Sequence, residues 1–109
     1  MTSEEQTLLF LLGYVYLQNA RPDKAAALYA ALDKLAPGQR NVLCALALAQ
    51  VRSGKAQRAL DSLDRLAMAG GGDAAFHLLR GQALHVLGRN EESQVATRTY
   101  LQLRGGGKP

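Results

Sequence analysis

The stretch LLFLLGYVYLQNARPDKAAALYAALDKLAPG, residues 8–38, decides the fold, because its pattern of small residues returns twice further along the chain. The period is 34 residues, and it links three sets of small side chains: Gly13, Ala47 and Gly81; Ala20, Gly54 and Gly88; Ala25, Ala59 and Ser93. Small residues recur where two helices approach closely or where the chain turns sharply. The sequence therefore predicts three copies of one helical hairpin.

This register predicts an all-α chain with helices at about 3–18, 22–35, 39–53, 56–68, 73–87 and 90–103. Start signals support the helices: a capping box of Ser3 with Gln6, Pro22 at a first helical position, and Asp73 and Asn90 as N-caps. We expect a single domain over residues 1–104, with repeats at about 6–39, 40–73 and 74–104. The polar, glycine-rich tail, residues 105–109, is expected to be disordered.

The first copy carries the pattern Leu9-x2-Leu12-Gly13-x2-Tyr16, followed by Ala25-x3-Tyr29 and Pro37. This pattern resembles the tetratricopeptide repeat (TPR), with Leu9 replacing the usual tryptophan and Tyr29 the usual phenylalanine. The resemblance implies three helix-turn-helix repeats that form a short superhelical array with a concave groove. The first turn, residues 19–21, lacks the glycine that TPR turns commonly carry, and this leaves its geometry open.

Length and composition fit one small domain, because 109 residues of which 48% are apolar can bury one modest core. The single cysteine, Cys44, cannot form an internal disulfide, and the net charge of +4 is spread over the chain. The apolar run from Leu8 to Leu17 is too short to cross a bilayer, and acidic residues precede it instead of the basic residues of a signal peptide. These features favour a cytoplasmic protein with no stable membrane insertion.

A helical wheel gives the first helix three apolar sides. Leu9, Leu12 and Tyr16, with Gly13, should pack inside the first hairpin. Phe10, Tyr14 and Leu17 fall on the side that lines the groove of a TPR array. The 34-residue period continues this wall with Cys44, Leu48 and Val51 in the second repeat and Leu78, Gln82 and His85 in the third.

The third side of the first helix consists of Leu8, Leu11 and Val15. In later repeats the equivalent side should pack on the preceding hairpin, through Val42, Ala45 and Ala49 or through Phe76, Leu79 and Ala83. The first repeat has no preceding hairpin, so its apolar side is expected to be exposed, and such patches usually mark interaction sites. The last helix instead carries a polar outer stripe of Glu91, Gln94, Arg98 and Gln102.

The predicted groove is mostly apolar, which suits an amphipathic helix or an extended apolar segment of a partner. TPR domains that grip acidic C-terminal peptides present Lys and Asn where this chain has Phe10 and Tyr14, so that subclass is disfavoured. A different interpretation buries part of the wall by closure of the chain on itself or by a homodimer.

Chemistry of other kinds has little support in the sequence. His77 and His85 are eight residues apart on one predicted helix, too far to chelate a metal as an i, i+4 pair could. Cys44 has no basic neighbour in sequence to activate it, and no nucleophile, base or metal cluster converges in this register. We therefore expect no enzyme activity and no cofactor. Basic residues without interleaved aromatics also argue against nucleic-acid binding.

A free-standing set of three TPRs with one apolar end is similar to the small TPR chaperones of bacterial type III secretion systems. The YscY/SctY family is the one this chain most resembles, through FLLGYVYLQ, KAAALYAALDKLAPG, RGQALHVLG and TYLQL. The resemblance implies a cytosolic chaperone that holds a small exported protein of the YscX/SctX type, with a 1:1 complex as the simplest stoichiometry, and that also engages the export-gate protein. It places the partner in the groove at Phe10, Tyr14, Leu17, Cys44, Leu48, Val51 and Leu78. The repeat period adds His85 to these candidate partner-binding residues.

Two other interpretations remain open at this point. A co-chaperone of the needle subunit, from the same secretion system, is also a small TPR protein, and the identity of the bound chain separates the two. A structural homo-oligomer would instead bury Leu8, Leu11 and Val15 against a second copy of the chain.

Overall fold

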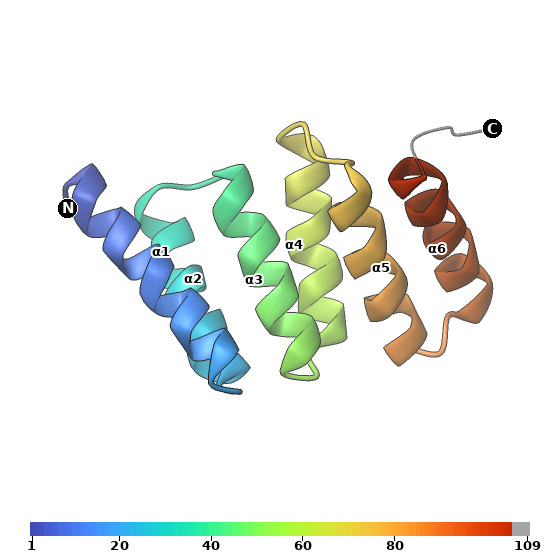
Figure 1. Cartoon of the computed structure of the whole chain (residues 1–109), viewed down its shortest axis with the longest axis horizontal. Helices are drawn as coiled ribbons and strands as arrows, with labels where there is room; N and C mark the ends of the chain where they lie inside the picture. The colour runs from blue at the N-terminus through green and yellow to red at the C-terminus, as the bar shows by residue number, and fades with distance from the viewer. Residues whose placement is uncertain (106–109) are drawn as a thin grey trace.

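The computed structural model describes residues 1–105, and this part of the chain forms six α-helices and no strands. They are α1 (Ser3–Gln18), α2 (Pro22–Leu35), α3 (Arg40–Arg52), α4 (Ala56–Met68), α5 (Ala74–Val86) and α6 (Asn90–Arg104). The helices stand side by side along a body of 45 × 28 × 24 Å (Figure 1). The predicted boundaries agree with these helices to within about one residue at each end. Gly105 caps α6, and the rest of the tail expected to be disordered lies outside the described residues.

The capping box of α1 lies one residue earlier than predicted. The backbone N–H of Glu5 donates to Thr2 Oγ1 at 3.1 Å, and the N–H of Thr2 donates to Glu5 Oε1 at 2.9 Å. Ser3 and Gln6 were expected to form this box, but Ser3 is already helical, since the N–H of Gln6 donates to the carbonyl of Thr2. Two overlapping pairs in the sequence fit the capping-box pattern, and the helix uses the first.

Of the other start signals, two are confirmed and one is wrong. Pro22 is the first residue of α2, and Asp73 caps α5 by accepting from the N–H of Phe76 at 3.1 Å. Asn90 was expected to cap the last helix, but it is the first helical residue, and Arg89 holds the cap position without a side-chain hydrogen bond. Arg89 closes the turn by donating its N–H to the carbonyl of Leu84, and its own carbonyl accepts from the N–H of Ser93, so the helix begins directly after it.

The three hairpin turns share one backbone geometry. Ala20, Gly54 and Gly88 all adopt left-handed φ values, of 57°, 79° and 75°. In each turn the next N–H donates back to a carbonyl five residues earlier, as Arg21 does to Tyr16 at 2.8 Å. This is the Schellman arrangement that ends many helices. The first turn therefore has the usual geometry although it carries alanine.

Small residues let the two helices of a hairpin approach closely, as the period predicted. A Cβ on Gly13 would overlap the buried ring of Tyr29, at 2.8 Å from its Cε1 atom. In the third hairpin, Ser93 Oγ donates to the carbonyl of Gly81 at 2.8 Å. In both repeats a glycine of the first helix lets the second helix approach closely, through an aromatic ring in the first repeat and through a hydrogen bond in the third.

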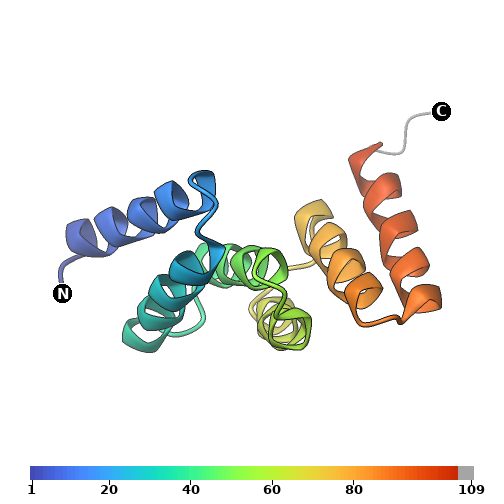
Figure 2. The ribbon, with the colours of Figure 1, turned by 90° about the horizontal axis from the view of Figure 1, so that it is seen from below.

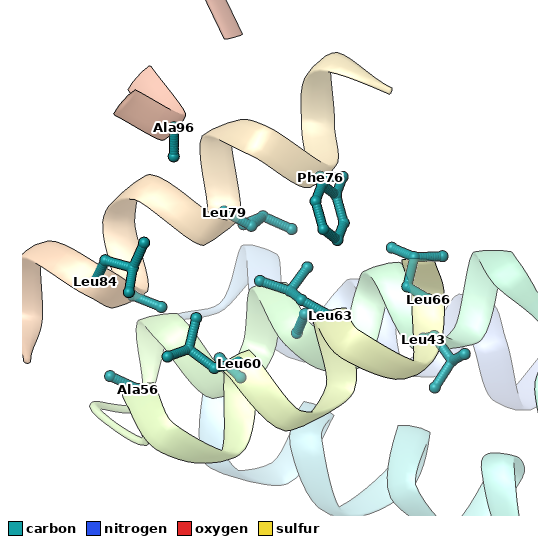
Figure 3. Packing of buried hydrophobic residues seen from close by; sticks show 12 residues of the cluster. Leu43, Ala56, Leu60, Leu63, Leu66, Phe76, Leu79, Leu84 and Ala96 are labelled. Atoms are coloured by element: carbon teal, nitrogen blue, oxygen red, sulfur yellow. The ribbon is translucent and has the colours of Figure 1, made fainter. Parts of the chain in front are cut away.

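The core consists of two clusters that join neighbouring repeats. One lies where α1, α2 and α3 meet and contains Leu17, Tyr29, Leu32, Val42 and Leu46 among its buried side chains. The other joins α3, α4, α5 and α6, and Figure 3 shows its leucines from α4 facing Phe76, Leu79 and Leu84 of α5. This is the nearest-neighbour packing of a repeat array, in which each hairpin is stabilised by the next.

Two polar contacts join the second helices to their neighbours. Arg65 on α4 forms a bidentate ion pair with the buried Asp33 on α2, with Nη2 at 3.0 Å from Oδ1. Ser62 donates to the buried side-chain oxygen of Gln50 at 2.7 Å. Gln50 stands where the first repeat has Tyr16, so the second repeat replaces an aromatic contact with a buried hydrogen bond.

The helices are arranged in two rows. Figure 2 shows α1, α3 and α5 along one side of the array and α2 and α4 along the other, with α6 at the outer end. Among the described helices, α3 packs on α2, α4 and α5, whereas α1 makes its extensive contacts with α2. None of the helices that the structure describes has the length and apolar character needed to span a membrane.

Candidate partner-binding surface

The row formed by α1, α3 and α5 carries most of the apolar side chains predicted to line the groove. Tyr14 on α1 is exposed at 53%. Five others are half-buried and reach the surface in part: Phe10, Cys44, Leu48, Val51 and Leu78. Gln82 and His85 on α5 are exposed and give the wall a polar end. The groove side of the array is therefore apolar over α1 and α3 and more polar toward the end of α5.

Leu17 is a correction to the predicted groove. Its side chain is only 8% exposed and belongs to the core cluster that also contains Ala26 and Ala49. The C-terminal end of α1 converges there on α2 and α3, so an angular position on the groove side does not give access to solvent. Leu17 therefore packs in the core beneath the groove surface and offers a partner almost no accessible surface.

Phe10 is held in place by the second helix of its own repeat. Its ring packs against Tyr29 with centroids 5.2 Å apart, and the Tyr29 hydroxyl donates to the carbonyl of Phe10 at 2.9 Å. Burial raises the pKa of Tyr29, so this hydroxyl stays a donor. The apolar surface of α1 is thus fixed in orientation before any partner binds.

A cavity of about 280 Å³ opens between α1 and α3 beside Phe10. Its lining combines Leu32 and Val42 with polar side chains that the sequence did not place beside the groove, namely Gln6, Thr7 and Asn41. Thr7 and Asn41 are 34 residues apart, so the repeat period itself would have placed both beside the groove. They add hydrogen-bonding groups to one margin of an apolar wall.

Cys44 lies on the other margin, in a cavity of about 300 Å³ shared with Asp73 and Leu66. Burial raises the pKa of the thiol, and the negative charge of Asp73 raises it further. The thiol therefore stays protonated at neutral pH and is a poor nucleophile. Its environment suits a small apolar contact with a partner.

The outer side of α1 is exposed, as the sequence predicted. Leu8, Leu11 and Val15 are 66%, 52% and 47% exposed. Their equivalents pack on the preceding hairpin, and most are buried: Val42 and Ala49 on α3, and Phe76, Leu79 and Ala83 on α5. The equivalent face is therefore covered by the preceding hairpin on α3 and on α5, and it is exposed to solvent on α1.

Leu12 departs from its predicted place inside the first hairpin, because it is 42% exposed. Leu9 and Tyr16 pack in part against the core cluster, as predicted, whereas Leu12 does not belong to it. At the other end of the array, the four polar residues predicted for the outer stripe of α6 are all exposed. The apolar surface of α1 is thus wider than predicted.

The two histidines have separate surroundings. The ring of His77 packs edge-on against Phe76 with centroids 5.0 Å apart, whereas His85 is exposed. Within residues 1–105, no three His, Cys, Asp or Glu side chains come together as a set that could hold a metal ion.

A solved structure with the same fold is the second TPR of Spaghetti (RPAP3) bound to the HSP90 peptide SRMEEVD. It superposes with a TM-score of 0.79 at 17% sequence identity, and the match covers 90% of this chain and 91% of that one. Among curated proteins, no sequence matches the chain significantly.

The sequence pattern of one protein family covers most of the chain. The tetratricopeptide repeat family matches residues 3–40 and 44–100. The match agrees with the left-handed turns, the close helix pairs and the stacked hairpins described above. The chain therefore belongs to the tetratricopeptide repeat family.

Proposed function

We propose that this chain is a binding module that holds an apolar segment of another protein along the row of α1, α3 and α5. The observation that carries the proposal is the surface formed by Phe10 and Tyr14 with Cys44, Leu48 and Val51, which is partly open to solvent and backed by a rigid core. Burying apolar side chains of this kind against a partner is the main source of affinity in helix-in-groove recognition.

The chemistry of the groove favours an apolar segment over an acidic peptide. The structural neighbour is bound to SRMEEVD, a peptide with an acidic end. At Phe10 and Tyr14 this chain offers aromatic rings in place of the Lys and Asn side chains that grip such peptides in other TPR domains. An amphipathic helix or an extended apolar strand can exclude water from those rings, whereas a free carboxylate would lose its hydration without a charged partner.

In finer terms, we propose a cytosolic chaperone of type III secretion, of the YscY/SctY kind. The chain would keep a small exported protein of the YscX/SctX type soluble in a 1:1 complex and help to deliver it to the export gate. Binding the apolar face of the exported chain stabilises it against aggregation by mass action, and release at the gate needs no catalysis. The sequence resemblance and the apolar end of the array support this proposal.

The test is co-expression of the chain with the small exported protein of the same secretion system, followed by light scattering and mass spectrometry. We expect a 1:1 complex. Glutamate at Tyr14 or at Leu48 should abolish capture because it places a charge against the partner's apolar face. Leu101→Glu is the matched control for the Tyr14 variant, since Leu101 is 54% exposed and lies on α6, outside the row of α1, α3 and α5.

Circular dichroism of each variant separates loss of binding from loss of fold. Equal capture by the wild type and by both groove variants would overturn the proposal. A complex formed with the needle subunit instead would assign the chain to the co-chaperones of that subunit. A homodimer that excludes any partner would assign the exposed apolar surface to self-association.

A further inference from the structure

The outer face of α1, formed by Leu8, Leu11 and Val15, is a surface distinct from the groove. With Leu12 and Tyr14 it gives one 16-residue helix five exposed large apolar side chains. No charged residue stands between Leu8 and Val15 in the sequence, and Glu4 lies one turn before Leu8 on the same side of the helix. A partner that fills only the groove would leave the outer face in water.

The chain itself shows what covers such a face. On α5 the equivalent residues are Phe76, Leu79 and Ala83, which are buried in the cluster that joins α3, α4, α5 and α6. Figure 3 shows leucines of α4 beside Phe76 and Leu79. The leucines of α4 that face α5 include Leu60 and Leu63, which are 4% and 0% exposed. The covering element is therefore an amphipathic helix with large apolar residues three or four apart.

The face of α1 matches the one on α5 better than the one on α3. On α1 and α5 the three positions carry two large side chains followed by a smaller one, Leu8, Leu11 and Val15 corresponding to Phe76, Leu79 and Ala83. On α3 the last two positions are alanines, which let α2 approach more closely. A helix resembling α4 is thus the covering element whose side-chain volumes fit α1.

We propose that an amphipathic helix of the partner protein lies on the outer face of α1 as α4 lies on α5. The proposal rests on the proposed binding of a partner protein and names a second element of that partner, in addition to the segment in the groove. The partner then encloses α1 from both sides and extends the array by one helix. The groove segment and the covering helix bury separate sets of residues on α1.

Stacking of a second copy end to end does not supply this helix. The surface that such stacking would bring against α1 includes the exposed polar residues Gln94, Arg98 and Gln102, which lie beside the exposed Val95 and Leu101 on α6. Burying these polar groups against leucines would leave them without hydrogen-bond partners, which opposes association. A helix with the apolar pattern of α4 has no such cost.

The experiment uses a synthetic peptide with the sequence of residues 54–70, which spans α4, added to the full-length ¹⁵N-labelled chain. Since the chain's own α4 already covers α5, the open acceptor face is the one on α1. We expect saturable amide shifts centred on residues 7–16. A peptide carrying Leu60→Asn and Leu63→Asn is the control and should give no saturable shifts.

Two variants of the chain locate the site. Leu11→Lys should weaken binding of the peptide at least tenfold, because Leu11 is at the centre of the outer face. Leu48→Glu, on the groove side of α3, should leave binding of the peptide unchanged. Because Leu48 also packs against both core clusters, circular dichroism of this variant must show the helix content of the wild type. The two surfaces are thereby separated: loss of partner capture in the Leu48 variant tests the groove, and loss of peptide binding in the Leu11 variant tests the outer face.

Three results would overturn the inference. They are the absence of saturable shifts in α1, shifts that centre on α3 and disappear with Leu48→Glu, and a homodimer in light scattering that dissociates with Leu11→Lys. The last result would show that a second copy occupies this face through contact between two α1 helices.

Discussion

Replacing Ala20 by glycine should stabilise the fold, while the reverse change at Gly54 should destabilise it by a similar amount. Both residues occupy the same position of the hairpin turn, with φ values of 57° and 79°. A left-handed conformation costs a residue with a Cβ about 1–2 kcal/mol. Glycine avoids that cost but loses about 0.4–1 kcal/mol more conformational entropy on folding than alanine does.

The difference between these two contributions gives about 0.5–1 kcal/mol in each direction. Contact strain does not complicate the comparison, because a Cβ on Gly54 would meet no atom within 4 Å. For a domain of this size, such a change moves the midpoint of thermal unfolding by about 3–6 °C. We therefore expect Ala20→Gly to raise the midpoint, Gly54→Ala to lower it, and the double variant to return close to the wild type.

Urea and thermal unfolding followed by circular dichroism provide the measurement. The m-value should stay constant across the three variants, since the surface buried in the native state does not change. If Ala20→Gly lowered the midpoint as much as Gly54→Ala does, the assigned backbone strain at Ala20 would be wrong. Both positions are in turns away from the groove, so capture of a partner is an independent check that the fold is kept.

Three further predictions follow from contacts inside the array. Gly13→Ala should destabilise the chain by about 1–3 kcal/mol in urea unfolding, because its Cβ overlaps the tyrosine ring of α2; an unchanged midpoint would show that the two helices can separate freely. The ion pair with Arg65 holds the pKa of Asp33 below its ordinary value of 3.8. The stability that this pair contributes is therefore present above about pH 4 and is lost as the pH falls through the lower pKa of the folded state. The thermal midpoint of Asp33→Asn should approach that of the wild type in acid, and a difference that is constant with pH would contradict this. Ser62→Ala should lower the free energy of unfolding by about 1–3 kcal/mol, because it leaves the side-chain oxygen of Gln50 buried without a donor. In a double-mutant cycle, adding Gln50→Leu should recover part of that loss. Strictly additive losses would show that the hydrogen bond is not the cause.

The repeat period carried most of the information about the fold. Because Gly13, Ala47 and Gly81 recur at one spacing, the close helix pairs and the helix boundaries could be placed from sequence. The repeat period placed the first turn at Ala20, but the alanine left the geometry of that turn open, and the structure shows that it is left-handed like the other two.

How deeply a side chain is buried was harder to predict from the sequence than which side of its helix the side chain lies on. The wheel placed Leu17 on the groove side, but its burial depends on how the end of α1 converges on α2 and α3. The exposure of Leu12 and the cavity beside Phe10 depend on the tilt of α1 relative to α3. That tilt is set by packing between hairpins, and a pattern within a single helix does not contain it.

The position of α1 at the edge of the array affects how the molecule fluctuates. Gly13 and Leu17 are the buried residues of this helix, and α2 supplies its main contacts. Local opening is cheapest where few apolar contacts are lost, so amide hydrogens of α1 should exchange with solvent faster than those of α3. Among the described helices, the one with the most exposed large apolar side chains is therefore also the one expected to open first. A partner that closes over it gains contacts and at the same time slows exchange in the whole first hairpin, so the two chains would share one cooperative unit of folding.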